Sequence, residues 1–241
     1  MIESLRPSGA AARFDDLPPV TVLLVRHGQT AMTLSHGYSG SGEPGPPLDE
    51  TGLAQAAAAA DLVQRVGDDL WGDIERPDEL IASPMVRTQQ TGAVIADRLG
   101  LTLRTDATFQ EADFGAWQGL TGAQIEERWP GQLEPWHSEG TLRPAGGGES
   151  LVDVAERVRA GMDRLRAGTP GRAGTPGRAV VVVSHAVAIR AMLGVALGAA
   201  PLSWSRLRVA PASLSIVRLF PDHRDEVAVV GAPSAGWGER R

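Results

Sequence analysis

Three short apolar runs constrain the fold of this chain more than any other feature. They are VTVLLV at 20–25, ELIA at 79–82 and VVVV at 180–183. Runs of this length, rich in β-branched residues, are typical of central strands that are buried on both faces of a sheet. Helical patterns follow them, at about 51–66, 84–99 and 186–198. This alternation predicts an α/β domain, which we expect to be a three-layer α/β/α sandwich with a mostly parallel central sheet.

Shorter patterns predict the remaining elements. A charged amphipathic helix is expected at about 149–167, a short helix at 121–128 and a short strand at 101–104. Two last strands, at 213–220 and 226–230, are close enough in sequence to pair as an antiparallel hairpin, which would make the sheet mixed.

Two glycine- and proline-containing stretches, 31–48 and 130–148, are expected to be loops that set substrate specificity. Ser83 is expected to cap the helix that follows it, with Pro84 in the first turn. Ser184 is expected to cap the last long helix in the same way.

Two histidines stand where predicted strands end. His27 comes just after the first apolar run, and His185 comes just after the run at 180–183. The carboxyl ends of parallel strands meet at one edge of a sheet, where ligands bind in open α/β folds, so both imidazoles should lie on the same rim. Arg26 precedes the first histidine, and Arg87 falls in the first turn of the helix predicted at 84–99. Two imidazoles and two guanidiniums are therefore expected to face one pocket.

Such a pocket should attract phosphate, because a guanidinium offers paired donors that match phosphate oxygens and stays charged. A neutral imidazole can attack phosphorus through one ring nitrogen while an acceptor holds the other, and we assign this role to His27. Arg26, Arg87 and His185 would stabilise charge on the phosphoryl oxygens. Glu111, in a glycine- and aromatic-rich loop, is the best candidate to protonate the leaving oxygen and then to activate water.

The composition and motifs of the chain exclude several other kinds of functional site. The chain has no cysteine and, among its 23 basic residues, no lysine, which excludes disulfides, thiolate ligands, cysteine nucleophiles and Schiff bases. It contains neither a GxxxxGK[ST] phosphate loop nor a DxDxDG calcium loop, and its acidic residues do not cluster with histidines. We therefore expect no metal and no organic cofactor. The net charge of −6 with scattered arginines argues against nucleic-acid binding.

Five ordered blocks resemble the motifs of the histidine phosphatase superfamily, the phosphoglycerate-mutase-like group. They are LLVRHGQT (23–30), SPMVRTQQT (83–91), EADFGAWQG (111–119), GGGES (146–150) and VVVVSHAVAIR (180–190), and the similarity covers about residues 20–220. The resemblance implies the phosphoglycerate-mutase-like fold and cofactor-free hydrolysis of a small-molecule phosphate ester through a phosphohistidine. It implies catalytic roles for His27, Arg26, Arg87, Glu111 and His185. We expect contacts with phosphate or substrate from Arg26, Thr30, Thr33, Ser39, Arg87, His185 and Ala186.

Within this superfamily the chain most resembles the branch of the α-ribazole-phosphate phosphatases and of the acid phosphatase domain found fused to ribonuclease H. The segments YSGSGEPGPPLDETG (38–52) and ASLSIVRLF (212–220) carry this resemblance. We expect no ribonuclease H domain, because the chain begins shortly before the RHG motif. Two positions depart from the family pattern. Thr33 stands where asparagine is frequent, and the arginine that is common near Gly37 is missing, so no substrate contact of that loop is carried over from the family.

A phosphoglycerate-type phosphomutase is the alternative enzyme. Mutases of this group carry an arginine directly after the acid/base glutamate and then a tyrosine, where this chain has Ala112 and Phe114. They also use a lysine to bind a carboxylate and a second phosphate, and this chain has none, so we prefer hydrolysis. The non-enzymatic alternative is a catalytically inactive module that binds a phosphorylated ligand. The retention of all five core residues argues against it.

The domain itself is expected to span 20–232, between a disordered leader at 1–19 and a flexible tail at 233–241. Residues 167–178 repeat AGTPGR and are expected to form a solvated loop. The most apolar stretch, 186–200, is interrupted by an arginine and is too short to cross a membrane, and the leader does not resemble a secretory signal. We therefore expect a cytoplasmic protein without membrane or nucleic-acid partners, with a homodimer left open.

Overall fold

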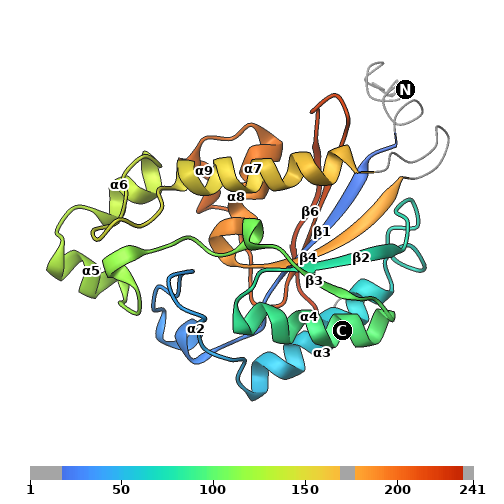
Figure 1. The fold of residues 1–241 in the computed structure, drawn as a ribbon, viewed down its shortest axis with the longest axis horizontal. Coiled ribbons are helices and arrows are strands. Elements are labelled where there is room, and N and C mark those ends of the chain that lie inside the picture. The colour runs from blue at the N-terminus through green and yellow to red at the C-terminus, as the bar shows by residue number, and fades with distance from the viewer. Residues whose placement is uncertain (1–17, 169–176, 236–241) are drawn as a thin grey trace, which may run out of the picture.

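In the computed structural model, which describes residues 18–168 and 177–235, a six-stranded sheet lies between helices (Figure 1). Its strands are β1 (Val20–Arg26), β2 (Pro77–Ala82), β3 (Leu103–Thr105), β4 (Arg178–Ser184), β5 (Leu214–Leu219) and β6 (Glu226–Ala232). Their order across the sheet is β3-β2-β4-β1-β5-β6. The strands β1 to β4 are parallel, whereas β5 runs antiparallel to both β1 and β6. The predicted mixed sheet and its C-terminal hairpin are confirmed.

Helices cover both faces of this sheet. On one face lie α3 (Glu50–Gln64) and α4 (Val86–Leu99), and on the other lie α7 (Leu151–Ala167) and α8 (Ala186–Leu197) (Figure 1). The predicted three-layer α/β/α sandwich is therefore confirmed. The shorter elements are α2 (Ala31–Ser35), α5 (Gly122–Arg128), α6 (Leu133–Ser138), α9 (Pro201–Trp204) and the 3-10 turns η1 (Ala107–Phe109) and η2 (Gly115–Trp117).

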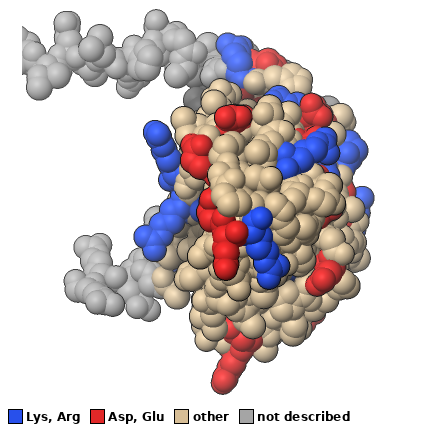
Figure 2. All heavy atoms as spheres, turned by 90° about the vertical axis from the view of Figure 1, so that its left-hand side faces the viewer, with Lys and Arg blue, Asp and Glu red and all other residues tan. Residues whose placement is uncertain are grey.

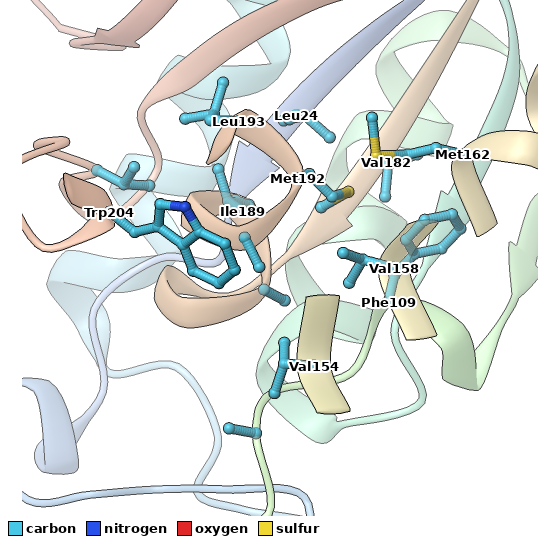
Figure 3. Packing of buried hydrophobic residues seen from close by; sticks show 14 of the residues in the cluster. Leu24, Phe109, Val154, Val158, Met162, Val182, Ile189, Met192, Leu193 and Trp204 are labelled. Atoms are coloured by element: carbon cyan, nitrogen blue, oxygen red, sulfur yellow. The ribbon is translucent and has the colours of Figure 1, made fainter. Parts of the chain in front are cut away.

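Alternate residues of the central strands build two separate cores. In β1, Leu24 belongs to the core under α7 and α8, whereas its neighbour Leu23 belongs to the core under α3 and α4. This follows from the two-residue period of a strand, and it explains why the run is apolar at almost every position. Figure 3 shows the first core, where Leu24 and Val182 of the sheet lie near Val158 of α7 and Ile189 of α8. Each fully buried side chain of this size stabilises the fold by about 1.5–3 kcal/mol.

Neither of the two serines expected to cap α4 and α8 is an N-cap residue. Ser184 is the last residue of β4, and the backbone N–H of Ser83 donates to the Val183 carbonyl oxygen at 3.1 Å. The helices begin later, with Met85 and His185 as N-cap residues, and neither residue gives its helix a side-chain hydrogen bond within the described chain. Both capping predictions are wrong, because strand pairing extends beyond the apolar runs. The serine hydroxyls are therefore available for other contacts.

The two segments predicted as loops, 31–48 and 130–148, each contain a short helix, so this prediction is wrong. In the first, Thr30 and Thr33 form a reciprocal capping box that begins α2. In the second, α6 carries Trp136, which is 1% exposed and packs edge-to-face against other buried aromatic rings. Helices this short are stabilised by such contacts rather than by a periodic apolar face.

The expected leader, the AGTPGR repeat and the C-terminal tail lie largely outside the described residues. Within the described ranges, no helix is long and apolar enough to cross a membrane. Figure 2 shows the end of the molecule that carries α5 and α6, where arginine and acidic side chains are interspersed. The visible face therefore presents no continuous basic stripe of the kind that nucleic acids bind.

Candidate active site

The register of the sheet brings the two predicted histidines together. Arg26 at the end of β1 pairs with Ser184 at the end of β4, and His27 and His185 are the next residues of their chains. The backbone N–H of His27 donates to the Ser184 carbonyl oxygen at 3.0 Å. The two ring centroids are 5.2 Å apart, with the ring planes inclined at 59°. Two distant parts of the chain thus place their imidazoles at one edge of the sheet.

Two hydrogen bonds define the state of the His27 ring. Nδ1 lies 2.7 Å from the Gly28 carbonyl oxygen, which can only accept, so Nδ1 carries the proton. Nε2 therefore holds the lone pair, and it accepts from the Nε–H of Arg87 at 3.1 Å. Burial, followed by the charges of Arg87 and Arg26, holds the pKa of His27 well below its usual value. His27 is thus neutral near pH 7, with Nε2 as its basic nitrogen.

His185 is fully buried beside it. Its Nε2 lies 2.8 Å from the hydroxyl oxygen of Ser83, while its Nδ1 has no hydrogen-bond partner in the part of the chain that is described. Burial, followed by the charge of Arg87, lowers the pKa of His185 well below the usual value, so this ring is also neutral. A hydroxyl can donate or accept. Donation from Ser83 to Nε2 leaves the ring proton on Nδ1, as a donor for an anion.

Arg26 and Arg87 bring two guanidiniums to the same edge. Arg87, in the first turn of α4, is 1% exposed and donates through Nη2 to the Ser39 carbonyl oxygen at 2.8 Å. Arg26 donates through Nη1 to the Val209 carbonyl oxygen at 2.8 Å. Burial lowers the pKa of each arginine to about 10, partly opposed by the charge of Glu111, so both stay charged near pH 7. Among the described residues, Nη1 of Arg87 and Nε of Arg26 are buried without a partner, and an anion would satisfy them.

Glu111 lies in the segment after η1 and is 6% exposed. Its Oε1 accepts from the backbone N–H groups of Ala112 and Ala188 at 3.0 and 3.2 Å, and its Oε2 accepts from that of Val187 at 3.2 Å. Val187 and Ala188 belong to the first turn of α8, whose own N-cap residue supplies no side-chain bond. Glu111 therefore caps α8 from a distant segment, where the positive end of the helix favours a carboxylate.

A cleft of about 440 Å³ opens over these groups. His185 is 0% exposed and lies behind its wall. The Thr30 and Thr33 hydroxyls are 3.2 Å apart and engaged in the capping box of α2, whereas the Ser39 hydroxyl is buried without a described partner. The predicted residues that line the cleft are Arg26, His27, Thr30, Thr33, Ser39, Arg87, Glu111 and Ala186.

Arg157 of α7, which we did not predict, anchors the segment that carries Glu111. Its Nη1 donates to the carbonyl oxygens of Thr108 and Gln110 at 2.7 and 3.0 Å, and its Nη2 donates to that of Glu111 at 3.4 Å. Nε and Nη2 also bind the Glu149 carboxylate, at 2.9 and 2.8 Å. The same carboxylate accepts from a backbone N–H two residues beyond Glu111 at 2.9 Å. The GGGES block and α7 thus hold the main chain on both sides of Glu111.

Sequence reasoning also missed Ser83, which contacts His185, and Arg190, which lines the cleft. Arg190 lies four residues after Ala186 on α8, so both belong to one face of the helix. That spacing was a usable signal for Arg190. For Ser83 the sequence held no equivalent signal.

Among the described residues, no group of three or more histidine, aspartate or glutamate side chains is arranged to hold a metal ion. The groups that are assembled are a neutral imidazole with a defined lone pair, two guanidiniums, a second imidazole and a carboxylate. A nucleophile beside fixed positive charge and a carboxylate that can carry a proton are the requirements for transfer of an anionic group such as phosphoryl.

Comparison with known proteins gives a consistent result. A family model described as the histidine phosphatase superfamily (branch 1) matches residues 22–230. The chain is 38% identical over 212 residues to the bifunctional protein Rv2228c of Mycobacterium tuberculosis. That match covers 88% of this chain and 54% of the relative, so the chain spans about half the length of that protein. It is also 35% identical to the glucosyl-3-phosphoglycerate phosphatase of the same species, over 77% of this chain and 79% of the relative.

Two solved structures extend the comparison. The native mycobacterial glucosyl-3-phosphoglycerate phosphatase Rv2419c superposes with a TM-score of 0.76 at 31% identity, covering 88% of this chain and 99% of its own. The α-ribazole phosphatase of Shigella flexneri superposes with a TM-score of 0.71 at 20% identity, covering 89% and 97%. At that identity the second likeness shows the shared fold alone.

Proposed function

The chain belongs to the histidine phosphatase superfamily, branch 1, and from this premise we propose that it hydrolyses phosphomonoesters through a phosphohistidine at His27. One observation carries the proposal. The Gly28 carbonyl fixes the proton of His27 on Nδ1, so Nε2 presents a lone pair next to two arginines. A neutral imidazole in this state is the form that attacks phosphorus.

In the first step, Nε2 of His27 attacks phosphorus, and the ester P–O bond breaks as the N–P bond forms. The Nε–H of Arg87, which donates to Nε2 at 3.1 Å, would donate to a phosphoryl oxygen instead. Arg26 would neutralise charge on the other oxygens, and the Nδ1–H of the neutral His185 ring would donate a hydrogen bond to one of them. A protonated Glu111 gives its proton to the leaving oxygen, which departs as an alcohol.

In the second step, water attacks the phosphorus of the phosphohistidine, and the Glu111 carboxylate accepts the proton of that water. The N–P bond breaks, its electron pair returns to Nε2 of His27, and inorganic phosphate leaves. Glu111 is then protonated again for the next cycle. The three backbone N–H groups that donate to its carboxylate hold the side chain in position through both steps.

Hydrolysis suits this chain better than phosphomutase activity. Ala112 and Phe114, which occupy the positions of the mutase arginine and tyrosine, are 0% and 3% exposed. The chain has no lysine to hold a second phosphate. The relative that matches 77% of this chain at 35% identity is named as a phosphatase, which supports the same choice.

We further propose that the substrate is a small phosphorylated metabolite, which a cleft of about 440 Å³ suits in size. A specialist for α-ribazole phosphate is a narrower proposal that rests on the blocks at 38–52 and 212–220. Because charged metabolites are retained inside cells, we also propose a cytoplasmic location for a protein with such a substrate. Cell fractionation would check this. A homodimer also stays a proposal, to be checked by light scattering.

The test is turnover of p-nitrophenyl phosphate by the wild type and by His27→Asn. His223→Asn is the matched control, because His223 is exposed and asparagine tolerates its left-handed backbone at φ 59°. Loss of the nucleophile should lower kcat about 10³-fold or more, while the control keeps its rate. Acid quench should trap phosphoprotein in the wild type and the control only. Normal turnover by His27→Asn would contradict the proposal.

Product analysis separates the alternatives. With 3-phosphoglycerate as the probe, a phosphatase releases inorganic phosphate, whereas a mutase returns the 2-phospho isomer. A chain that binds phosphate esters and releases phosphate from none of a broad panel would be the inactive module.

A further inference from the structure

The peptide unit between Gly28 and Gln29 carries the oxygen that fixes the His27 ring. Its carbonyl oxygen lies 2.7 Å from Nδ1 of His27. Glycine has no Cβ, so its backbone turns more freely than that of any other residue, and local sterics do not set the direction of this carbonyl. A contact from another part of the chain is therefore needed to hold the peptide unit in place.

The helix α3 comes close enough to make that contact. A Cβ on Gly52, in the first turn of α3, would lie 2.1 Å from the Gln29 carbonyl oxygen, and a Cβ on Gly28 would lie 2.3 Å from the Gly52 carbonyl oxygen. The two glycines thus let two backbones approach where side chains would separate them. Gln55 is three residues further along α3, so it shares a face of the helix with Gly52. Its side chain therefore emerges beside the same peptide unit.

Gln55 binds the other end of this peptide unit. Its Oε1 accepts from the backbone N–H of Gln29 at 2.8 Å. This N–H and the Gly28 carbonyl belong to one planar trans peptide, in which they point in opposite directions. Holding the N–H therefore fixes the carbonyl, and donation by the N–H also polarises the peptide, which makes its oxygen a stronger acceptor. A continuous path of hydrogen bonds thus leads from Gln55 to Nδ1 of His27.

The preceding peptide unit is held separately. The backbone N–H of Gly28 donates to the hydroxyl oxygen of Thr91 at 3.2 Å, and this hydroxyl donates to the Arg87 carbonyl oxygen at 2.8 Å. Rotation of the peptide after Gly28 is the freedom that this contact leaves, and Gln55 removes it. Gln55 is half-buried, and it is not among the described residues that line the cleft. It therefore acts through the peptide rather than on a ligand.

We propose that Gln55 is a positioning residue, which keeps the proton of His27 on Nδ1 and so keeps Nε2 free to attack phosphorus. The inference rests on the proposed function, because it takes His27 as the nucleophile. Without a ligand, Arg87 favours the same tautomer, since its Nε–H donates to Nε2. Once that N–H turns to a phosphoryl oxygen, the carbonyl held by Gln55 is the contact that fixes the ring.

The ¹⁵N shifts of the His27 ring nitrogens, read with inorganic phosphate bound, test this directly. Gln55→Met keeps a good helix former of similar length and removes the oxygen acceptor. In this variant we expect the proton to be shared between Nδ1 and Nε2. The wild type and Gln64→Met, an exposed position of the same helix, should keep it on Nδ1. Unchanged His27 shifts in Gln55→Met would overturn the inference.

Kinetics provides a second measurement. In Gln55→Met, kcat/KM for p-nitrophenyl phosphate should fall about 2- to 10-fold, the effect of one hydrogen bond. The affinity for inorganic phosphate should not weaken, because the guanidiniums that hold the anion are unaltered. A parallel loss of phosphate affinity would overturn the inference, since it would mean that the whole site is disturbed.

Gln55→Glu retains an oxygen acceptor at the same distance along the side chain, so it should keep the proton on Nδ1 and kcat/KM within about 3-fold of the wild type. This variant decides the question if Gln55→Met does not fold. A proton on Nε2 in Gln55→Glu would overturn the inference. Failure of the wild type to release phosphate would instead contradict the proposed function, because the ring tautomer is read without turnover.

Discussion

Arg157 contacts Glu111 at its main-chain carbonyl oxygen, 3.4 Å from Nη2, and so fixes the backbone of the proposed acid/base residue from the neighbouring helix. The same guanidinium binds two further carbonyl oxygens of that segment and the Glu149 carboxylate. A planar fork with five donors suits this many acceptors, and a lysine ammonium does not. The position of the Glu111 side chain therefore depends on a residue outside the cleft.

We expect Arg157→Lys to lower kcat about 10- to 100-fold while KM for p-nitrophenyl phosphate changes little, because the phosphate contacts remain in place. The loss should be larger for alkyl phosphates than for the aryl ester, since a poor leaving group depends more on protonation. Steady-state kinetics with both esters checks this, with Arg159→Lys on the exposed side of α7 as the control. Equal losses for both esters would mean that Arg157 acts on stability alone.

Glu111→Gln should separate the two chemical steps. p-Nitrophenolate leaves without a proton donor, so His27 can still be phosphorylated, but the attack of water then lacks its base. We expect a burst of about one p-nitrophenol per active site, followed by turnover that is slower by roughly 10²- to 10⁴-fold. Stopped-flow absorbance and acid-quenched phosphoprotein measure the two phases. Exposed Glu139→Gln is the control, and a full steady-state rate without a burst would remove Glu111 from the mechanism.

Ser83→Ala tests whether the Ser83 hydroxyl orients the His185 ring through its 2.8 Å contact. The loss of one buried hydrogen bond is worth about 0.5–1.5 kcal/mol, so kcat/KM should fall roughly 2- to 10-fold. The more direct measurement is the ¹⁵N shift of the ring nitrogens, which reports the tautomer. Unchanged shifts of His185 in the variant would show that its proton is held without Ser83.

The buried histidines predict a loss of stability in mild acid. Their pKa values are well below the usual 6.5 in the folded chain, so the unfolded chain binds more protons below that pH. Stability then falls as pH decreases from about 6.5, by up to about 1.4 kcal/mol per pH unit for each histidine, until the folded pKa is reached. Urea unfolding between pH 7 and 5 measures this slope. His27→Asn should reduce this slope by the contribution of one histidine. An unaltered slope would contradict the low pKa of His27.

Much of the site follows from backbone order alone. His27 and His185 directly follow neighbouring parallel strands, and Arg87 lies in the first turn of the helix after a third parallel strand. The apolar runs were therefore sufficient to predict that these three residues lie close together. Ser83 could not be assigned, because a single additional residue of strand pairing decides whether its hydroxyl caps a helix or reaches His185. Arg157 could not be assigned either, since its partners are mostly carbonyl oxygens, which every residue possesses.

The short helices within 31–48 and 130–148 escaped prediction for a different reason. Each has fewer than two full turns, so no apolar period can be recognised in it. What holds α6 is burial of Trp136 among rings from other segments, and that contact exists only in the folded chain.

The carboxylate that closes the amino end of α8 is also the one assigned to carry the proton. Selection for chemistry and selection for a durable fold therefore act on the same two oxygen atoms. A descendant of this protein that no longer needed its reaction would still be penalised for replacing Glu111 with a residue lacking an acceptor, because the first turn of α8 would lose its cap. Retention of glutamate at this position across a lineage would then be a weaker sign of activity than retention of His27.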